Sequence, residues 1–254
     1  MNAISRIAAA CFIIALPIFL ITSNVRILAS EVRFYERGFR EYDAPEATGL
    51  PLSELDRAAR EIIDYFENDT ETIRIVVNDN GEELSLFNAK ETEHMEDVKW
   101  LMRVVYRVQE ISMAFVLSYV VAVFLWTGER SLRSLAKLSL AGVAAGCAIV
   151  ATLGALALAG FDQFWRQFHE IAFRNDLWQL DPDTDRLIQM FPEPFWEEAT
   201  YIVALLTLAE VTLIVAISAA YLLASRTRPQ PQALEPLPDV VLPAVASPTE
   251  EPNG

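Results

Sequence analysis

The chain's only two histidines are the residues best suited to acid–base chemistry. His94 lies among carboxylates in KETEHMEDVK (90–99), and His169 lies among aromatic residues in FWRQFHEIAFRND (164–176). An imidazole has an unperturbed pKa near neutral pH, so it can both accept and release a proton there. A single histidine on an apolar face is more often a structural residue. Two imidazoles that share one site could instead catalyse a reaction by proton transfer.

Other chemistries find less support in the sequence. Carboxylates near the histidines could add metal ligands, namely Glu91, Glu93, Asp97 and Glu170. However, no HExxH motif or other recognised ligand spacing is present, and a catalytic zinc ion usually needs three protein ligands. The sequence also has no GxSxG nucleophile elbow of a serine hydrolase. We therefore expect no metal and no other cofactor, with a metal-dependent membrane hydrolase as an alternative.

The composition is typical of a membrane protein. Hydrophobic residues make up 53% of the chain and charged residues 22%, so long apolar blocks alternate with strongly polar segments. The formal net charge of −15 argues against a nucleic-acid partner, because binding to a phosphate backbone needs clustered Lys and Arg. The two cysteines, Cys11 and Cys147, both lie inside apolar blocks, so no disulfide framework is expected.

Four apolar blocks are long enough to cross a bilayer, since about 30 Å of hydrocarbon requires roughly 20 helical residues. The predicted transmembrane helices cover residues 1–29, 104–126, 138–160 and 199–224. The first block could alternatively be a cleaved signal peptide, but its apolar run is long, and Arg26 is unusual just before a cleavage site. We predict an all-α polytopic membrane protein with four transmembrane helices.

Basic residues predict the orientation of these helices. They lie before the first block, between the second and the third, and after the fourth: Arg6, Arg130, Arg133, Lys137, Arg226 and Arg228. Because cytoplasmic loops carry an excess of Lys and Arg, both termini and the loop 127–137 are expected in the cytoplasm. Segments 30–103 and 161–198, and with them both histidines, are then extracytoplasmic. The Pro-rich acidic tail at 225–254 is expected to be disordered.

The segment 30–103 has the pattern of a small extracytoplasmic α+β cap that leads into the second helix. Apolar residues at helical spacing predict a helix over 53–68. Two β-branched runs on either side of an Asp-Asn-Gly sequence predict a hairpin within 72–87, because this tripeptide favours a tight turn.

The residues after the hairpin predict how His94 is held. Asn88 and Glu91 fit an N-cap residue and its N3 partner, so a helix should begin there and run unbroken into the second membrane span. On that helix His94 shares one stripe with apolar residues such as Val98 and Val105. His94 therefore heads an apolar face that continues into the bilayer.

The segment 161–198 begins with closely spaced aromatic residues. They recur at spacings of three and four from Phe161 to Phe173, which suits an amphipathic helix at the level of the lipid headgroups. Trp165, His169 and Phe173 share one face of this helix, so the imidazole should point towards lipid or protein. Both histidines are then expected at the outer membrane boundary, on helices that can face one another.

Small and polar residues also occur within the predicted spans. Gly142 and Gly146 form a GxxxG pattern that lets helices approach closely, and we favour packing within the chain over dimerisation. Glu210 lies roughly 16 Å into the fourth span at 1.5 Å per residue. It is either a functional ionisable group or a hydrogen-bonded structural carboxyl. Arg107 and Glu110 are spaced for an i, i+3 ion pair at the outer end of the second span.

Two motifs resemble those of a known family of small bacterial membrane proteins. They are FNxKExxHMxDVK at 87–99, ahead of the second span, and FHxIxFxNDxWxLDPxTDxLIxxFPxxFW at 168–196, ahead of the fourth. The chain resembles the lipoprotein intramolecular transacylases, called Lit, over about residues 5–225. The resemblance implies a four-span protein of the bacterial cytoplasmic membrane, and it places the family's catalytic histidines at His94 and His169.

The resemblance also implies a substrate and a reaction. The substrate would be a diacylated bacterial lipoprotein at the outer face of the membrane, where the protein also contacts membrane lipid. The sn-2 acyl chain of the S-diacylglyceryl group on the N-terminal cysteine would move to the α-amino group of the same cysteine, giving a lyso-form lipoprotein. Because ester and amine belong to one molecule, correct positioning can supply about 7–11 kcal/mol of the barrier in the best cases.

For this reaction His94 is the expected general base, with Glu91 or Asp97, each three residues away, as the carboxylate that orients it. His169 would polarise the ester or protonate the departing glycerol oxygen. The two histidines could also exchange these roles.

Three further residues are candidates for contact with the substrate: Arg174, Asn175 and Arg107. The first two closely follow His169 and could donate to the oxyanion, whereas the third could meet a lipid phosphate or carbonyl. A membrane module without enzymatic activity, whose acidic cap and tail bind other molecules, is the remaining alternative. No partner protein can be identified from the sequence.

Overall fold

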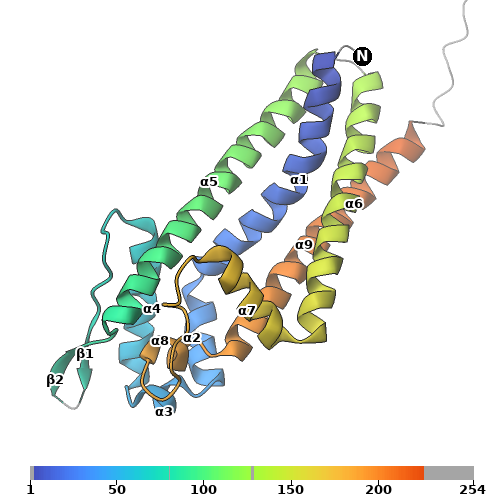
Figure 1. Ribbon diagram of the computed structural model, residues 1–254. Helices are drawn as coiled ribbons and strands as arrows, with labels where there is room; N and C mark the ends of the chain where they lie inside the picture. The colour runs from blue at the N-terminus through green and yellow to red at the C-terminus, as the bar shows by residue number, and fades with distance from the viewer. Residues whose placement is uncertain (1–2, 80, 127–128, 226–254) are drawn as a thin grey trace, which may run out of the picture.

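Four long helices form the body of the molecule (Figure 1). The computed structural model describes residues 3–79, 81–126 and 129–225. Within them, four helices are long and apolar enough to cross a membrane: α1 (Ala3–Ala29), α5 (Ala89–Trp126), α6 (Glu129–Ala159) and α9 (Glu193–Ala224). This confirms the predicted polytopic fold with four membrane helices.

Helix α1 packs in the middle of this bundle. It contacts α5, α6 and α9, and its buried Phe12, Leu16 and Leu20 form one cluster with Val143 on α6 and Val211 on α9. Figure 1 shows the start of α1, the end of α5 and the start of α6 at one end of the bundle, and α9 ends towards the same side. Because α1 fills the centre of the bundle, its packing favours a retained helix over a cleaved signal peptide.

Two helices begin earlier than the sequence pattern predicted. Residues 129–137, expected as part of a cytoplasmic loop, form the first turns of α6. This stretch has good helix formers and neither Gly nor Pro, so nothing stops the helix from extending beyond the apolar span. Helix α9 starts at Glu193, not at 199, with Pro194 in its first turn, where the missing N–H costs nothing. The tail from 226 onwards lies outside the described residues.

A small α+β cap covers the other end of the bundle (Figure 1). Its elements are α2 (Val32–Glu41), α3 (Ala44–Thr48), α4 (Leu52–Glu67), β1 (Val76–Asp79), β2 (Glu82–Ser85) and α8 (Arg186–Met190). Helix α4 and the antiparallel hairpin confirm the predicted elements. Gly81 has a φ of +97°, which glycine adopts without strain, and Asn80 of the expected turn lies outside the described residues.

Helix α2 joins the cap to the start of α9. Its Phe34 packs against Phe195 with ring centroids 4.6 Å apart, and its Phe39 packs against Phe191 at 5.4 Å. Gly38 allows this close approach, because a Cβ there would lie 2.6 Å from the Phe195 ring. Helix α2 was not predicted from the sequence, although its apolar residues recur at helical spacing.

The helix that carries His94 begins with the predicted capping box. The Asn88 N–H donates to Glu91 Oε2 at 2.8 Å, and the Glu91 N–H donates to Asn88 Oδ1 at 3.0 Å. With 38 residues, α5 is about 57 Å long at 1.5 Å per residue. This length far exceeds about 30 Å of hydrocarbon. Its charged first four turns, residues 89–103, therefore project from the membrane and carry His94 into the cap.

The polar groups inside the bundle bond to one another. Asn24 on α1 donates through Nδ2 to Thr207 Oγ1 at 3.1 Å and to Glu210 Oε2 at 3.0 Å, both on α9. Asn24 and Thr207 are almost fully buried. These bonds support the structural interpretation of Glu210, because an unpaired polar group at this depth would be costly.

Gly142 and Gly146 pack against α1, as the preferred interpretation of the GxxxG pattern predicted. A Cβ on Gly142 would lie 3.1 Å from Leu16 Cδ2, and one on Gly146 would lie 3.0 Å from Pro17 Cβ. Helices α1 and α6 therefore approach closely because these residues have no side chain. The glycines serve contacts within the chain.

We expect Gly146→Leu to lower the free energy of unfolding by about 1–3 kcal/mol, the usual cost of overpacking. Thermal unfolding of the protein purified in detergent measures this. Gly154→Leu is the matched control on the same helix, because a Cβ there meets no atom within 4 Å. Equal unfolding temperatures for the two variants would contradict the proposed role of the small residues.

Candidate active site

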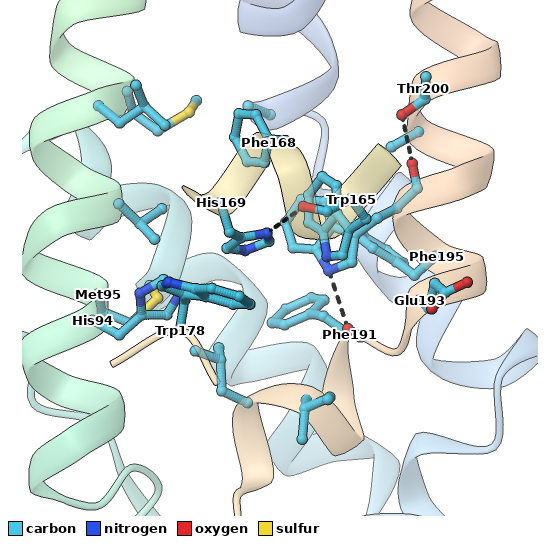
Figure 2. A pocket seen from close by; sticks show the side chains of 18 of the residues that line it. His94, Met95, Trp165, Phe168, His169, Trp178, Phe191, Glu193, Phe195 and Thr200 are labelled. Carbon is cyan, nitrogen blue, oxygen red and sulfur yellow. Dashed lines mark hydrogen bonds between the residues drawn. The ribbon is translucent and has the colours of Figure 1, made fainter. Parts of the chain in front are cut away.

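The structure brings the two histidines together. His94 projects from α5, and His169 projects from α7 (Phe161–Ala172), which follows α6 after Gly160. Their ring centroids are 6.2 Å apart, with 34° between the ring planes. Both side chains are buried, with 5% and 8% of their surface exposed. Figure 2 shows His94, His169 and Trp178 close together on one side of the pocket.

The two rings line a cavity of about 850 Å³ between the cap and the membrane helices. Most of its wall is apolar and comes from α1, α5, α7 and α9, with parts of the cap. Aromatic residues surround the histidines within this wall: Trp165, Phe168, Phe173, Trp178 and Trp196. Such a wall can hold fatty-acyl groups, and it keeps water away from the imidazoles.

Aromatic contacts fix the position of the His169 ring. Its centroid lies 4.7 Å from the Trp165 ring and 5.0 Å from the Trp178 ring, and Trp165 stacks on Trp196 at 5.0 Å. The shared face of Trp165, His169 and Phe173 was predicted from their spacing. The contribution of Trp178 was missed, because it lies beyond the end of α7 in a loop that folds back over the site. Its only sign in the sequence is its place in the second motif.

A backbone carbonyl determines which nitrogen of His169 carries the proton. Nδ1 lies 2.8 Å from the carbonyl oxygen of Trp165. A carbonyl oxygen can only accept, so Nδ1 must donate, and in the neutral ring Nε2 then keeps its lone pair. Burial lowers the pKa of His169, although the bond to Trp165 opposes this shift. At neutral pH His169 therefore presents Nε2 as a base.

His94 lacks such a fixed partner. Its Nδ1 is buried and has no hydrogen-bond partner among the described residues. Burial, with a contribution from His169, lowers the pKa of His94 to about 4. His94 is consequently neutral at physiological pH, and no described residue fixes its tautomer through Nδ1. A neutral imidazole can still donate a hydrogen bond from whichever nitrogen is protonated.

Glu91 does not orient His94, which differs from the prediction. Its Oε2 accepts from the Asn88 N–H, and its Oε1 accepts from the N–H of Leu187 at 2.6 Å. Both oxygens are therefore used by backbone groups, and Nδ1 of His94 has no partner. Glu91 instead ties the start of α5 to α8, a segment 96 residues further along the chain.

Asp97 and Asn175 bond to each other instead of acting in the cavity. Asn175 donates through Nδ2 to Asp97 Oδ2 at 2.8 Å, which attaches the loop after α7 to α5. Neither residue lines the cavity, and Asp97 makes no hydrogen bond to His94. The structure thus gives them a role in joining the two helices that carry the histidines.

The two predicted arginine contacts also lie outside the cavity. Arg174 is exposed, because α7 ends at Ala172 and the chain then turns away. Arg107 is exposed as well, and it forms the predicted ion pair with Glu110 at 3.1 Å. The arginine that does line the cavity is Arg166, three residues before His169 on α7. Its spacing from His169 could have identified it, once a helix was assumed there.

The described residues contain no group of three or more His, Cys, Asp or Glu side chains that could hold a metal ion. The carboxylates near His94 point to other partners, as their bonds to backbone and amide groups show. Besides the two imidazoles, the mostly apolar cavity is lined by four charged residues, Asp162, Arg166, Glu170 and Glu193. This arrangement suits proton transfer on a bound substrate.

A family model described as lipoprotein intramolecular transacylase Lit matches residues 10–196, which span both histidine motifs. The chain belongs to the Lit family. This match covers α1 from residue 10 onwards, the whole cap, both histidines and the start of α9. The resemblance deduced from the two motifs is thereby confirmed.

Solved structures show that the chain shares the Lit fold. The membrane-integral transacylase Lit from Bacillus cereus is 16% identical, with a TM-score of 0.72 over 90% of this chain and all of that one. A variant of that protein with a histidine replaced by alanine has a TM-score of 0.69, over 89% of this chain and 96% of the variant. An uncharacterised protein from Aquifex aeolicus is 29% identical over 121 residues. That match spans about half of each chain, 48% of this one and 51% of the relative.

Proposed function

We propose that this Lit family member is a lipoprotein intramolecular transacylase. It moves the sn-2 acyl chain of an S-diacylglyceryl N-terminal cysteine to the α-amino group of that cysteine, giving the lyso-form lipoprotein. The observation that carries this proposal is the pair of buried imidazoles, 6.2 Å apart, on the wall of a cavity of about 850 Å³. A diacylated bacterial lipoprotein is the substrate class that combines an ester, an amine and acyl chains.

The proposed orientation places the site outside the cytoplasm. The N-terminal ends of α1 and α6, whose first turns include Arg6, Arg133 and Lys137, lie at the end of the bundle opposite the cap (Figure 1). Since positive loops stay in the cytoplasm, this end is the cytoplasmic one, and cap and cavity are extracytoplasmic. Arg226 and Arg228, which support the same orientation, lie outside the described residues. This is the side of the bacterial membrane where lipidated N-termini are exposed.

The reaction needs one proton carrier. The cysteine amine attacks the ester carbonyl carbon, and a nitrogen–carbon bond forms. Nε2 of His169 takes the proton from the resulting ammonium. The bond between the carbonyl carbon and the glycerol oxygen then breaks, and His169 returns the proton to that oxygen. No group is gained or lost, so neither an acyl-enzyme nor a second substrate is required.

His94 takes the complementary role. An N–H of its neutral ring donates to the oxyanion of the tetrahedral intermediate, where a donor in a dry site stabilises developing charge strongly. These assignments adopt the exchange of roles that the sequence left open, in place of the first expectation. The reason is the bond from His169 Nδ1 to the Trp165 carbonyl, which leaves Nε2 of His169 as the defined base.

Mass spectrometry of a lipoprotein tests the proposed activity. The protein is expressed in a bacterium that leaves its lipoproteins diacylated with a free N-terminus, and one lipopeptide is then fragmented. Transfer within the molecule leaves the mass unchanged, so the fragments must place an acyl chain on nitrogen. Unchanged lipopeptides, with the protein present in the membrane, would reject the activity. Loss of activity in EDTA would favour a metal-dependent hydrolase.

The pH dependence of transfer provides a second test. An α-amine has a pKa of about 7.7–8.0 and attacks only when neutral. The lowered pKa values keep both histidines neutral through this range. We expect the rate on a synthetic lipopeptide to rise with pH, about tenfold per unit below the amine pKa, and to level off above pH 8. A half-maximum near 6.5 would show control by an ordinary imidazole and contradict the assignment.

A further inference from the structure

On the membrane side of the cavity, the deepest lining residue of each of three helices is a valine. Val25 on α1, Val105 on α5 and Val203 on α9 all line the cavity, and on each helix no lining residue lies deeper in the bundle. We call these three residues the valine floor. Above it, apolar residues of α5 such as Val98 and Leu101 line the cavity up to His94.

The space directly beneath the valine floor is filled. Asn24 and Thr207 lie next to floor residues on α1 and α9, but they do not line the cavity, and their exposed fractions are only 2% and 1%. Asn24 Nδ2 donates to Thr207 Oγ1 at 3.1 Å, and Thr207 Oγ1 donates to the carbonyl oxygen of Val203 at 2.8 Å. This chain of hydrogen bonds joins α1 and α9 and fixes the position of Val203.

The distance from the histidines to the floor is comparable to the length of a fatty-acyl chain. Eleven residues separate His94 from Val105 on one unbroken helix, which is about 16 Å at 1.5 Å per residue. An extended protein backbone spans at most about 3.6 Å per residue, which is three bonds. An extended fatty-acyl chain therefore lengthens by roughly 1.2 Å per bond. The cavity thus accommodates roughly 13 bonds of a straight chain.

The geometry points to the valine floor as the element that selects the length of the transferred acyl chain. The inference rests on the proposed transacylase activity. With the ester carbonyl between the two imidazoles, the acyl chain runs along α5 and its methyl end meets Val25, Val105 and Val203. A chain that is too long for this space must bend or displace the floor, which its hydrogen bonds resist.

Substitution of Val203 tests this inference on the full-length protein in lipid–detergent micelles. Synthetic lipopeptides carry a constant sn-1 palmitoyl chain and sn-2 chains of 8, 12 or 16 carbons, and fragmentation quantifies N-acylation. Val203→Trp makes the cavity shorter and should lower the ratio of 16-carbon to 8-carbon transfer by roughly tenfold or more. A single methylene group that does not fit an apolar pocket already changes substrate discrimination by about this factor. Val203→Ala lowers the floor and should raise this ratio.

Leu205→Trp is the matched control, because Leu205 is two residues away on α9, lies outside the cavity and is 65% exposed. Its chain-length ratio should equal that of the unmodified protein. Ratios that stay unchanged in both Val203 variants would overturn the inference while leaving the transacylase intact. The absence of transfer by the unmodified protein for every chain length would reject the proposed activity itself.

Discussion

His169→Gln is expected to lower the rate of acyl transfer by about 10²–10⁴-fold, the usual contribution of a general base. The glutamine amide can still donate to the Trp165 carbonyl, but it presents no basic lone pair to the substrate amine. The rate of N-acylation of a synthetic lipopeptide by purified protein measures the loss. His169→Ala should lose at least as much activity.

Substitutions of His94 distinguish the two roles. His94→Ala removes a donor to the oxyanion and should cost about 10²–10³-fold. His94→Gln keeps an N–H donor in the same place and should retain clearly more activity than His94→Ala. No such rescue is expected at position 169. If glutamine rescued position 169 but not position 94, the assignment of base and donor would have to be exchanged.

Glu91→Ala should lower the free energy of unfolding by about 1–3 kcal/mol, because it leaves the buried N–H of Leu187 without an acceptor. It also removes the capping bond to the N–H of Asn88, an exposed residue, and the Glu91 side chain that accepts both bonds is 1% exposed. Chemical or thermal unfolding in detergent measures the change. Activity should fall with the folded fraction, since Glu91 positions α5 and α8 and does not touch the imidazoles.

Glu93→Ala is the matched control for Glu91, because it removes a carboxylate from an exposed position two residues away. Its stability should stay within about 0.5 kcal/mol of the unmodified protein. A Glu91→Ala protein that unfolds normally but has lost its activity or changed its pH profile would contradict the positioning role. Glu91 would then act on His94 electrostatically.

The sequence was sufficient to predict the helices that carry the histidines. The capping box at Asn88 and Glu91 and the aromatic face of Trp165, His169 and Phe173 are local patterns, so a short stretch of chain determines them. The same holds for the hairpin and for the membrane helices. Helix α2 was missed because its burial depends on Phe195, which is distant in sequence and packs against Gly38.

The partners of the carboxylates could not be predicted from spacing. Glu91 and Asp97 lie one helical turn from His94, which made both of them plausible orienters. In the structure each bonds to a group that follows α7 in the chain, the N–H of Leu187 and the amide of Asn175. Such pairings arise from tertiary packing. Arg174 was chosen and Arg166 was missed for a similar reason, since the end of α7 at Ala172 determines which arginine faces the cavity.

The acceptor that sets the His169 tautomer belongs to the main chain, and this protects it from mutation. Any amino acid at position 165 supplies the same carbonyl one turn before the imidazole, so the protonation pattern survives even Trp165→Ala. Only a change in the helix backbone itself could remove it. The aromatic neighbours of this ring can therefore vary without changing which of its nitrogens carries the proton.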